Sequence, residues 1–152
     1  MPERLSPRHR SWNMAQIRSK DTKPEVAVRS LLHRAGYRFR RTTYGLAGKP
    51  DVVLPRWKTA VFVHGCFWHQ HHGCIDCSRP TTNSAYWLPK LARNVTRDRH
   101  VRRALRRAGW KVVVVWECEC KNSELILNRV DQAAGRTRSK SLSCIKAKSN
   151  LR

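Results

Sequence analysis

The segment from His64 to Cys77 holds four histidines and three cysteines within fourteen residues. Residues 65–80 follow neither the apolar period of a helix nor the alternation of a strand, so they are predicted to form a loop. Histidine nitrogen and cysteine sulfur are the ligands that structural zinc prefers, in sets of four. The chain is therefore expected to hold this loop in shape with a metal ion.

Four residues could supply the ligands of such a zinc site: Cys66, His71, Cys74 and Cys118. The first three have the spacing C-x4-H-x2-C, which suits a zinc loop. The fourth lies just beyond an apolar run that ends at Trp116, so it would tie the loop to the sheet. Other residues compete for these positions: His72 with His71, Cys77 with Cys74 or Cys118, and Cys120 as a spare thiol. A set of free thiols is the alternative interpretation.

Disulfides are a weaker explanation for the six cysteines, because nothing in the sequence indicates secretion. Residues 1–10 are polar and lack the apolar stretch of a signal peptide. No apolar run approaches the roughly 20 residues that span a bilayer. The protein is therefore expected to be cytoplasmic, with no membrane partner.

The apolar periods and end signals predict a mixed sheet with helices packed against it, an α/β fold. The expected helices are Thr22–Gly36, which opens on a Thr22-to-Glu25 capping box, then Asn83–Ala108 and Ser123–Ala134. The expected strands are Tyr37–Tyr44, Asp51–Leu54, Thr59–His64 and Trp110–Trp116, with a hairpin turn at Pro55–Lys58. The last strand is almost unbroken in its apolar residues, which predicts a central strand buried on both faces.

The two ends of the chain differ from the part between them. Residues 1–20 are basic and are expected to form a flexible arm, with a short helix around Asn13–Ile17. Residues 21–134 carry the periodic segments and are expected to form one domain. Residues 135–152 are basic, rich in serine and aperiodic, so they are expected to be disordered.

The charge of the chain indicates its partner. Lys and Arg number 32 against 10 Asp and Glu, a net charge of +22. Such an excess favours a polyanionic partner, and nucleic acid is the first candidate. A ribosomal or membrane-surface protein is the alternative. Charge alone separates neither DNA from RNA nor an enzyme from a binding protein.

Catalytic residues are expected where two strands end. Asp51 opens a strand after a glycine-containing loop, where a carboxylate can hold Mg²⁺ and the metal can polarise a phosphate. Alone, such an aspartate is more typical of a turn. The next strand ends at His64, and His69 follows, so two potential general bases would lie near Asp51. Glu25 has a structural role in the capping box but could also approach this site.

Three aromatic residues lie outside the amphipathic pattern. Phe67 and Trp68 fall in the polar loop, and Trp87 opens the long helix. Exposed rings in a basic protein can wedge between base pairs or stack on bases, which costs least at a mismatch. The alternative is that these rings cover the zinc loop as a small core. Three other tryptophans lie in or beside strands and are expected in the core: Trp57, Trp110 and Trp116.

Several motifs together resemble the very short patch repair (Vsr) endonucleases. They are Asn13-Met14, Thr22 with Glu25, Gly48-Lys49-Pro50-Asp51, His64-Gly65-Cys66-Phe67-Trp68-His69, Asn94-Val95 with Arg97-Asp98-Arg99, Gly109-Trp110 and Trp116-Glu117-Cys118. The match covers about residues 11–120. The HGCFWH stretch combined with WEC is highly specific for this family.

The resemblance implies a restriction-endonuclease-like α/β fold with a central mixed sheet, flanking helices and a structural zinc site. It implies that residues 21–134 are an endonuclease domain that hydrolyses phosphodiester bonds with Mg²⁺. The expected reaction is a nick 5′ to the T of a T:G mismatch in double-stranded DNA, left when 5-methylcytosine deaminates. The expected setting is the bacterial nucleoid, with a monomeric enzyme and mismatch-repair proteins as further candidate partners.

The resemblance also assigns roles by position. Asp51 is similar to the magnesium ligand, together with the backbone carbonyl of Val63. His69 is similar to the residue that activates water and His64 to a phosphate or transition-state partner, and Glu25 gains a catalytic role. The residues that carry over as zinc ligands are Cys66, His71, Cys74 and Cys118. The residues that carry over as intercalating are Phe67, Trp68 and Trp87, with Met14 entering from the minor groove.

Two positions depart from the family pattern. Val63 stands where the family often has threonine, a change that a backbone ligand tolerates. The loop over residues 69–74 is one residue longer than the usual form, so His71 and His72 both remain candidates for the zinc site.

Three functions follow from these features. The first is a mismatch-nicking repair enzyme, which the candidate wedge residues favour. The second is a related nuclease that reads another lesion or a specific sequence. The third is a zinc-stapled DNA-binding module without catalysis, which would have no reason to place Asp51 beside two histidines.

Overall fold

A three-stranded mixed sheet forms the centre of the computed structural model, which describes residues 6–15, 20–41 and 43–137. Its strands are β1 (Val52–Leu54), β2 (Thr59–His64) and β3 (Lys111–Trp116). β1 pairs antiparallel with β2 through the short 3₁₀ turn Pro55–Trp57, and β2 pairs parallel with β3. The mixed α/β architecture expected from the sequence is therefore confirmed.

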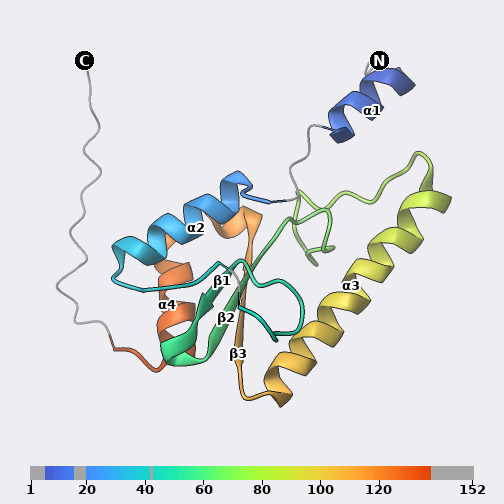
Figure 1. Ribbon diagram of the computed structural model, residues 1–152. Coiled ribbons are helices and arrows are strands. Elements are labelled where there is room, and N and C mark those ends of the chain that lie inside the picture. The colour runs from blue at the N-terminus through green and yellow to red at the C-terminus, as the bar shows by residue number, and fades with distance from the viewer. Residues whose placement is uncertain (1–5, 16–19, 42, 138–152) are drawn as a thin grey trace, which may run out of the picture.

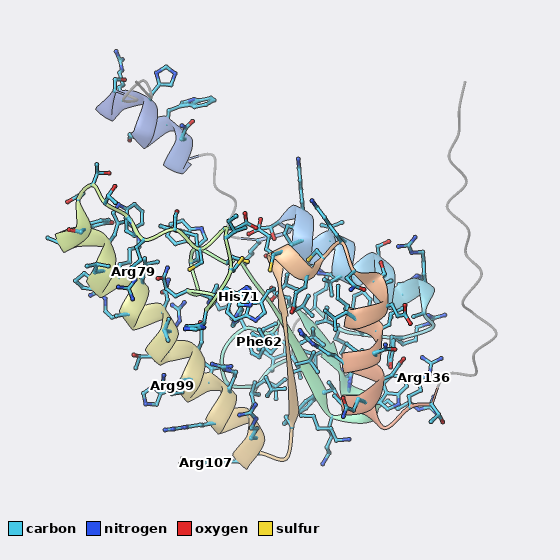
Figure 2. All side chains as sticks on the ribbon, turned by 180° about the vertical axis from the view of Figure 1, so that it is seen from behind. Phe62, His71, Arg79, Arg99, Arg107 and Arg136 are labelled. Carbon is cyan, nitrogen blue, oxygen red and sulfur yellow. The ribbon has the colours of Figure 1, made fainter. Side chains whose placement is uncertain are left out.

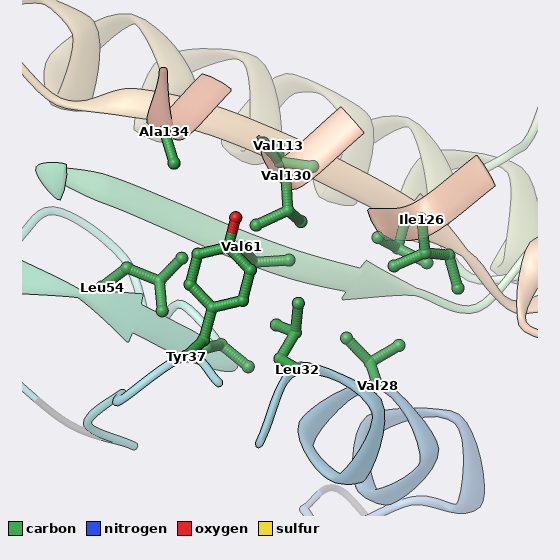
Figure 3. Packing of buried hydrophobic residues seen from close by; sticks show 11 residues of the cluster. Val28, Leu32, Tyr37, Leu54, Val61, Val113, Ile126, Val130 and Ala134 are labelled. Carbon is green, nitrogen blue, oxygen red and sulfur yellow. The ribbon is translucent and has the colours of Figure 1, made fainter. Parts of the chain in front are cut away.

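Helices cover both faces of this sheet (Figure 1). Helices α2 (Lys23–Arg34) and α4 (Ser123–Ala134) pack on one face, and the long helix α3 (Ser84–Arg107) packs on the other. The larger core lies under α2 and α4, where Leu32, Tyr37 and Val61 are fully buried (Figure 3). The smaller core joins Ala60, Phe62 and Leu105 under α3.

The alternation of side chains along β2 decides which residues can meet α3. Val61 belongs to the core under α2 and α4, whereas Ala60 and Phe62 belong to the core under α3. Because side chains alternate with a period of two, His64 continues the row of Ala60 and Phe62. The strand therefore delivers a buried histidine to the side of the sheet that α3 covers.

The position of β3 differs from the prediction. The strand order is β1-β2-β3, so β3 is an edge strand and β2 is central. The run of valines reflects helices on both faces, since Val113 and Val115 are buried under α4 and Val112 packs in the smaller core. Strand neighbours on both edges are not required for this pattern. Arg129 donates to the edge carbonyl of Val114 at 3.4 Å, which satisfies one of the groups left unpaired there.

The predicted strand over Tyr37–Tyr44 is wrong. Among the described residues of this segment, only Arg40 forms a bridge, to Val53, and the chain then turns toward α3. The alternation arises because Tyr37 and Phe39 both pack against the larger core, where the Tyr37 hydroxyl donates to Asp131, and not because the segment pairs along its length. Gly48 ends this excursion with a positive φ and approaches Val101 so closely that a side chain would not fit.

The N-terminal helix is longer and earlier than predicted. Helix α1 spans Pro7–Ala15, whereas the sequence indicated a short helix around Asn13–Ile17. Ser6 and Pro7 carry the missed signal, because the Ser6 hydroxyl accepts from the His9 N–H at 3.3 Å and proline suits the first helical position. The predicted disorder of residues 135–152 falls almost wholly outside the described residues.

The start of α2 also differs in detail from the expected capping box. Thr22 is the N-cap residue, but its side chain does not accept from the first turn of the helix. Instead the Thr22 hydroxyl donates to the Glu25 carboxylate at 2.9 Å, and the Asp21 N–H donates to the other oxygen of Glu25 at 2.9 Å. Glu25 therefore stabilises the helix start by holding two donors from the preceding turn.

Among the described residues, no helix is long and apolar enough to cross a membrane.

Candidate active site

Asp51 immediately precedes β1 and lies at the edge of the sheet where β2 ends. Its backbone N–H donates to the Val61 carbonyl at 3.0 Å, and its Oδ2 accepts from the Val63 N–H at 2.7 Å. The Oδ1 atom has no hydrogen-bond partner among the described residues. Burial raises the pKa of Asp51 to about 6 against the lowering effect of the Val63 N–H. This carboxylate is thus short of positive charge and has one oxygen free.

Glu25 reaches the same region from α2. The negative charge of Glu25 contributes to the raised pKa of Asp51, because the two carboxylates repel each other. Arg29 lies between the two acids in its interactions. It forms ion pairs with Glu25 at 2.9 Å and with Asp21 at 2.6 Å, and its charge lowers the pKa of Asp51. The capping function of Glu25 and its proximity to Asp51 are therefore compatible.

His69 is held by Asp98, an acid for which the sequence indicated no role. Its Nδ1 lies 2.5 Å from Oδ2 of Asp98, and both side chains are mostly buried, with exposures of 21% and 14%. A carboxylate partner keeps the hydrogen on Nδ1, so the lone pair of Nε2 is free to accept a proton. The signal that could have found Asp98 is its isolation, since it is the only acid in the arginine-rich α3.

His64 lies parallel to His69, with ring centroids 3.9 Å apart and an interplanar angle of 8°. Burial, and next the charge of His69, lower the pKa of His64 to about 4. His64 is therefore neutral at physiological pH and can donate or accept one hydrogen bond, but it does not bring a positive charge to a phosphate.

Four ligands converge next to this histidine pair. The Cys and His side chains whose ligand atoms lie within 4.8 Å of one another are Cys66, His71, Cys74 and Cys118. This donor set fits a tetrahedral metal site, and burial raises the pKa of the Cys66 thiol when no cation balances a thiolate there. His72 is exposed and lies outside this cluster, as does Cys77.

A column of rings joins the two sites. His71 stacks on Trp116 at 4.1 Å, and Trp116 meets His64 edge-on at 5.4 Å. His64 in turn stacks on His69. The loop that carries the candidate metal ligands is therefore linked to the histidine pair through direct ring contacts. Figure 2 shows His71 at the end of the sheet, where the loop crosses it.

Comparisons with known proteins identify the chain. The family model for the DNA mismatch endonuclease Vsr matches residues 3–76. The type II nicking enzyme V.XorIIP of Xanthomonas oryzae is 51% identical over 119 residues, which cover 78% of this chain and 87% of that protein. The chain belongs to the Vsr family of endonucleases. It is therefore a nuclease that acts on DNA.

Other members of the Vsr family support the same assignment. The DNA mismatch endonuclease Vsr of Escherichia coli is 42% identical over 115 residues, with 76% of this chain and 73% of that protein covered. The type II nicking enzyme V.NaeI of Lentzea aerocolonigenes is 52% identical over 116 residues, with 72% and 68% covered. Relatives with both kinds of name thus lie at comparable similarity.

The three candidate wedge residues of this Vsr family chain lie together. Phe67, Trp68 and Trp87 contact one another with ring centroids 5.3 to 5.8 Å apart, and all three are half-buried. The carbonyl of Trp68 accepts from Asn94 at 3.3 Å, which fixes the loop to α3. The ammonium group of Lys90 lies 5.3 Å from the Trp87 ring and 5.7 Å from the Trp68 ring. Aromatic surface and positive charge are thus presented side by side.

Met14 falls within α1, and its side chain lies outside what the structure describes.

Proposed function

We propose that this protein is a mismatch endonuclease that nicks double-stranded DNA 5′ to the T of a T:G mismatch, in a magnesium-dependent hydrolysis. The observation that carries the proposal is a half-buried Asp51 carboxylate, with its pKa raised to about 6, whose charge interacts with the nearby His69–Asp98 pair. The family description and the E. coli relative, both named as mismatch endonucleases, support the choice of substrate.

The residues around Asp51 fit a magnesium ion. Mg²⁺ prefers hard oxygen ligands and is often bound through one or two carboxylates. Asp51 offers a free Oδ1, and the backbone carbonyl of Val63 is proposed as a second oxygen ligand. When bound, the ion would polarise the phosphate and lower the pKa of water. Glu25 is proposed to add negative charge to the same site.

The chain's own residues supply the proton transfer. His69 accepts a proton from the attacking water at Nε2, while Asp98 holds the ring in the required tautomer and stabilises the imidazolium that forms. His64 is neutral and packs flat on His69, so it orients the ring and can donate to a phosphate oxygen. Asp98 is thus a positioning residue.

Changing Asp98 to Asn is expected to lower kcat roughly 10²- to 10⁴-fold, the range typical of general base catalysis. The amide can no longer enforce the Nδ1–H tautomer of His69, whereas the duplex still binds, so KM should change little. The measurement is steady-state nicking across pH. A rise in KM with kcat unchanged would contradict a positioning role for Asp98.

The aromatic cluster is proposed to intercalate at the mismatch. Changing Phe67 or Trp68 to Ala is expected to reduce the preference for T:G over T:A duplexes by roughly 10- to 100-fold, because one stacked base contributes about 1–3 kcal/mol. Tyr44→Ala is the matched control, since Tyr44 is 98% exposed and lies outside the cluster. Equal nicking ratios in all three variants would assign these rings to the support of the loop.

The direct test is nicking of end-labelled duplexes that carry a T:G mismatch in varied flanking sequence, beside matched T:A duplexes. Under the proposal, a nick forms 5′ to the T in the mismatched duplex alone, and only with Mg²⁺ present. Nicking of both duplexes at one sequence would instead support the second candidate, a sequence-directed nicking enzyme, which the names of V.XorIIP and V.NaeI favour.

The remaining assignments rest on the same proposal. Zn²⁺ is proposed as the metal of the Cys/His cluster, Met14 as a minor-groove contact, and a restriction-endonuclease-like fold as the wider class. We further propose a monomer in the bacterial cytoplasm, associated with the nucleoid. In this proposal residues 1–20 contact DNA, residues 21–134 form the endonuclease domain, and mismatch-repair proteins are partners.

A further inference from the structure

Helix α3 carries far more positive charge than the candidate active site uses. It contains eight Lys and Arg residues and one acid, Asp98. That acid is bound to His69, and its neighbour Arg102 turns back to the Asp98 carbonyl at 3.4 Å. The rest of the helix therefore has no internal carboxylate to balance its guanidinium groups.

Four of these arginines form an outer strip on the second half of the helix. The strip consists of Arg99, Arg103, Arg106 and Arg107, all exposed. Arg99, Arg103 and Arg107 follow one another at four-residue intervals, so they lie on one face with a rise of roughly 6 Å per step. Figure 2 shows Arg99 and Arg107 on the side of α3 that faces away from the sheet.

The four guanidinium groups of the outer strip have no ion-pair partners among the described residues, and their mutual repulsion destabilises the helix. Like charges at four-residue intervals destabilise a helix. Arginine is also the side chain whose planar donors match phosphate oxygens in pairs. Arginines about 6 Å apart can contact roughly every second phosphate of a duplex strand, which has a phosphate about every 3.4 Å along the helix axis.

The outer strip points away from the candidate active site. Leu91, Asp98 and Leu105 recur at seven-residue intervals and mark the inner face of α3, where Asp98 meets His69. Arg103 lies on the far side of a helix about 10–12 Å wide. A duplex held at Asp51 would have to bend sharply around α3 to reach it, although DNA is stiff over roughly 150 base pairs.

We propose that the outer strip binds a second segment of double-stranded DNA through its phosphate backbone while the first segment occupies the active site. The enzyme can then hold two duplexes, and transfer between DNA segments becomes possible without full release. This inference requires only that the chain acts on DNA, not that it selects T:G mismatches.

The test is capture of a second duplex by the full-length protein. A biotinylated duplex is immobilised and saturated with protein in Ca²⁺ in place of Mg²⁺, and a fluorescent duplex is then added at increasing salt. We expect the wild type to retain the fluorescent duplex. The Arg103→Gln/Arg107→Gln variant should retain at least about tenfold less of it. The slope of log affinity against log salt for the second duplex should fall by roughly 1.8, about 0.9 per lost phosphate contact.

The control is Arg34→Gln/Arg38→Gln, which removes the same charge from exposed positions at and just beyond the end of α2. It should capture the second duplex like the wild type, and both double variants should nick a short duplex within about twofold of the wild type. Equal capture by Arg103→Gln/Arg107→Gln would overturn the inference. So would sedimentation that finds two protein chains for every two duplexes, because two active sites would then explain the bridging.

Discussion

Replacing Asp51 with asparagine is expected to abolish nicking while stabilising the folded protein at neutral pH. A metal contributes several kcal/mol of transition-state stabilisation, and each 1.4 kcal/mol is a factor of ten, so nicking should fall roughly 10³-fold or more. Duplex binding should persist, because Asp51 brings negative charge to a site that meets phosphates. The measurements are single-turnover nicking and equilibrium binding of the same duplex.

The expected gain in stability follows from the pKa of Asp51. Burial raises that pKa from 3.8 to about 6, so the folded state binds a proton more tightly than the unfolded state does. The ionised carboxylate therefore destabilises the fold above pH 6, by up to about 3 kcal/mol at 1.4 kcal/mol per pKa unit. The penalty disappears as pH falls toward 3.8. Asparagine removes it and can still accept from the Val63 N–H.

The melting temperature of Asp51→Asn should thus exceed that of the wild type at pH 7 to 8, with the difference shrinking as pH approaches 4. The experiment uses magnesium-free buffer without chelator, so that the proposed metal of the Cys/His cluster is not removed. Glu124→Gln is a matched control, because Glu124 is exposed on α4 and belongs neither to the Asp51 site nor to the Cys/His cluster. A destabilised Asp51→Asn at pH 8 would mean that the carboxylate serves the fold and not a metal.

With zinc in the Cys/His cluster as proposed, changing Cys74 or Cys118 to Ser is expected to remove that metal and, with it, nicking. The segment from Gly65 to Asn83 has no regular secondary structure before α3 begins, so the proposed metal would be what holds it in place. Apparent binding energies of structural zinc sites are roughly 10–16 kcal/mol, comparable to the whole stability of a domain. Loss of a ligand should therefore release the loop that carries Phe67, Trp68 and His69.

The measurements are metal content of the purified protein, limited proteolysis of residues 65–80 and nicking. The wild type should contain one zinc per chain and resist cleavage in the loop, whereas the two variants should lose zinc, be cut there and nick at least about 100-fold more slowly. Cys77→Ser and His72→Ala are matched controls, because neither residue belongs to the cluster. Zinc loss in a control with retention in Cys74→Ser would reassign the ligands.

Local sequence signals predicted most of the elements, because those elements are stabilised by short-range effects. Helices α2, α3 and α4 begin and end within a few residues of their apolar periods and cap signals. The β1–β2 hairpin follows the turn at Pro55, with Lys58 in the left-handed conformation that closes it. The strand predicted around Tyr37 was wrong because Tyr37 and Phe39 both pack against the core under α2 and α4, which gives the same alternation as a strand.

The candidate metal cluster was also accessible from sequence, since cysteine and histidine have few other reasons to gather in one loop. The choice of His71 over His72 was not accessible. Adjacent histidines have the same chemistry, and only the stacking of His71 on Trp116, a residue of β3, turns that ring toward the three cysteines.

The sequence by itself determined the fold class, the family and the residue types that can hold metal, because these depend on periodicity and on motifs within short segments. The tertiary structure decided which groups act on one another. Asp98 reaches His69 across 29 residues, and burial, not sequence neighbours, raises the pKa of Asp51. The central place of β2 follows from its parallel pairing with β3 after the long crossover through α3. Such long-range contacts depend on how the helices cover the sheet, and no local pattern encodes that packing.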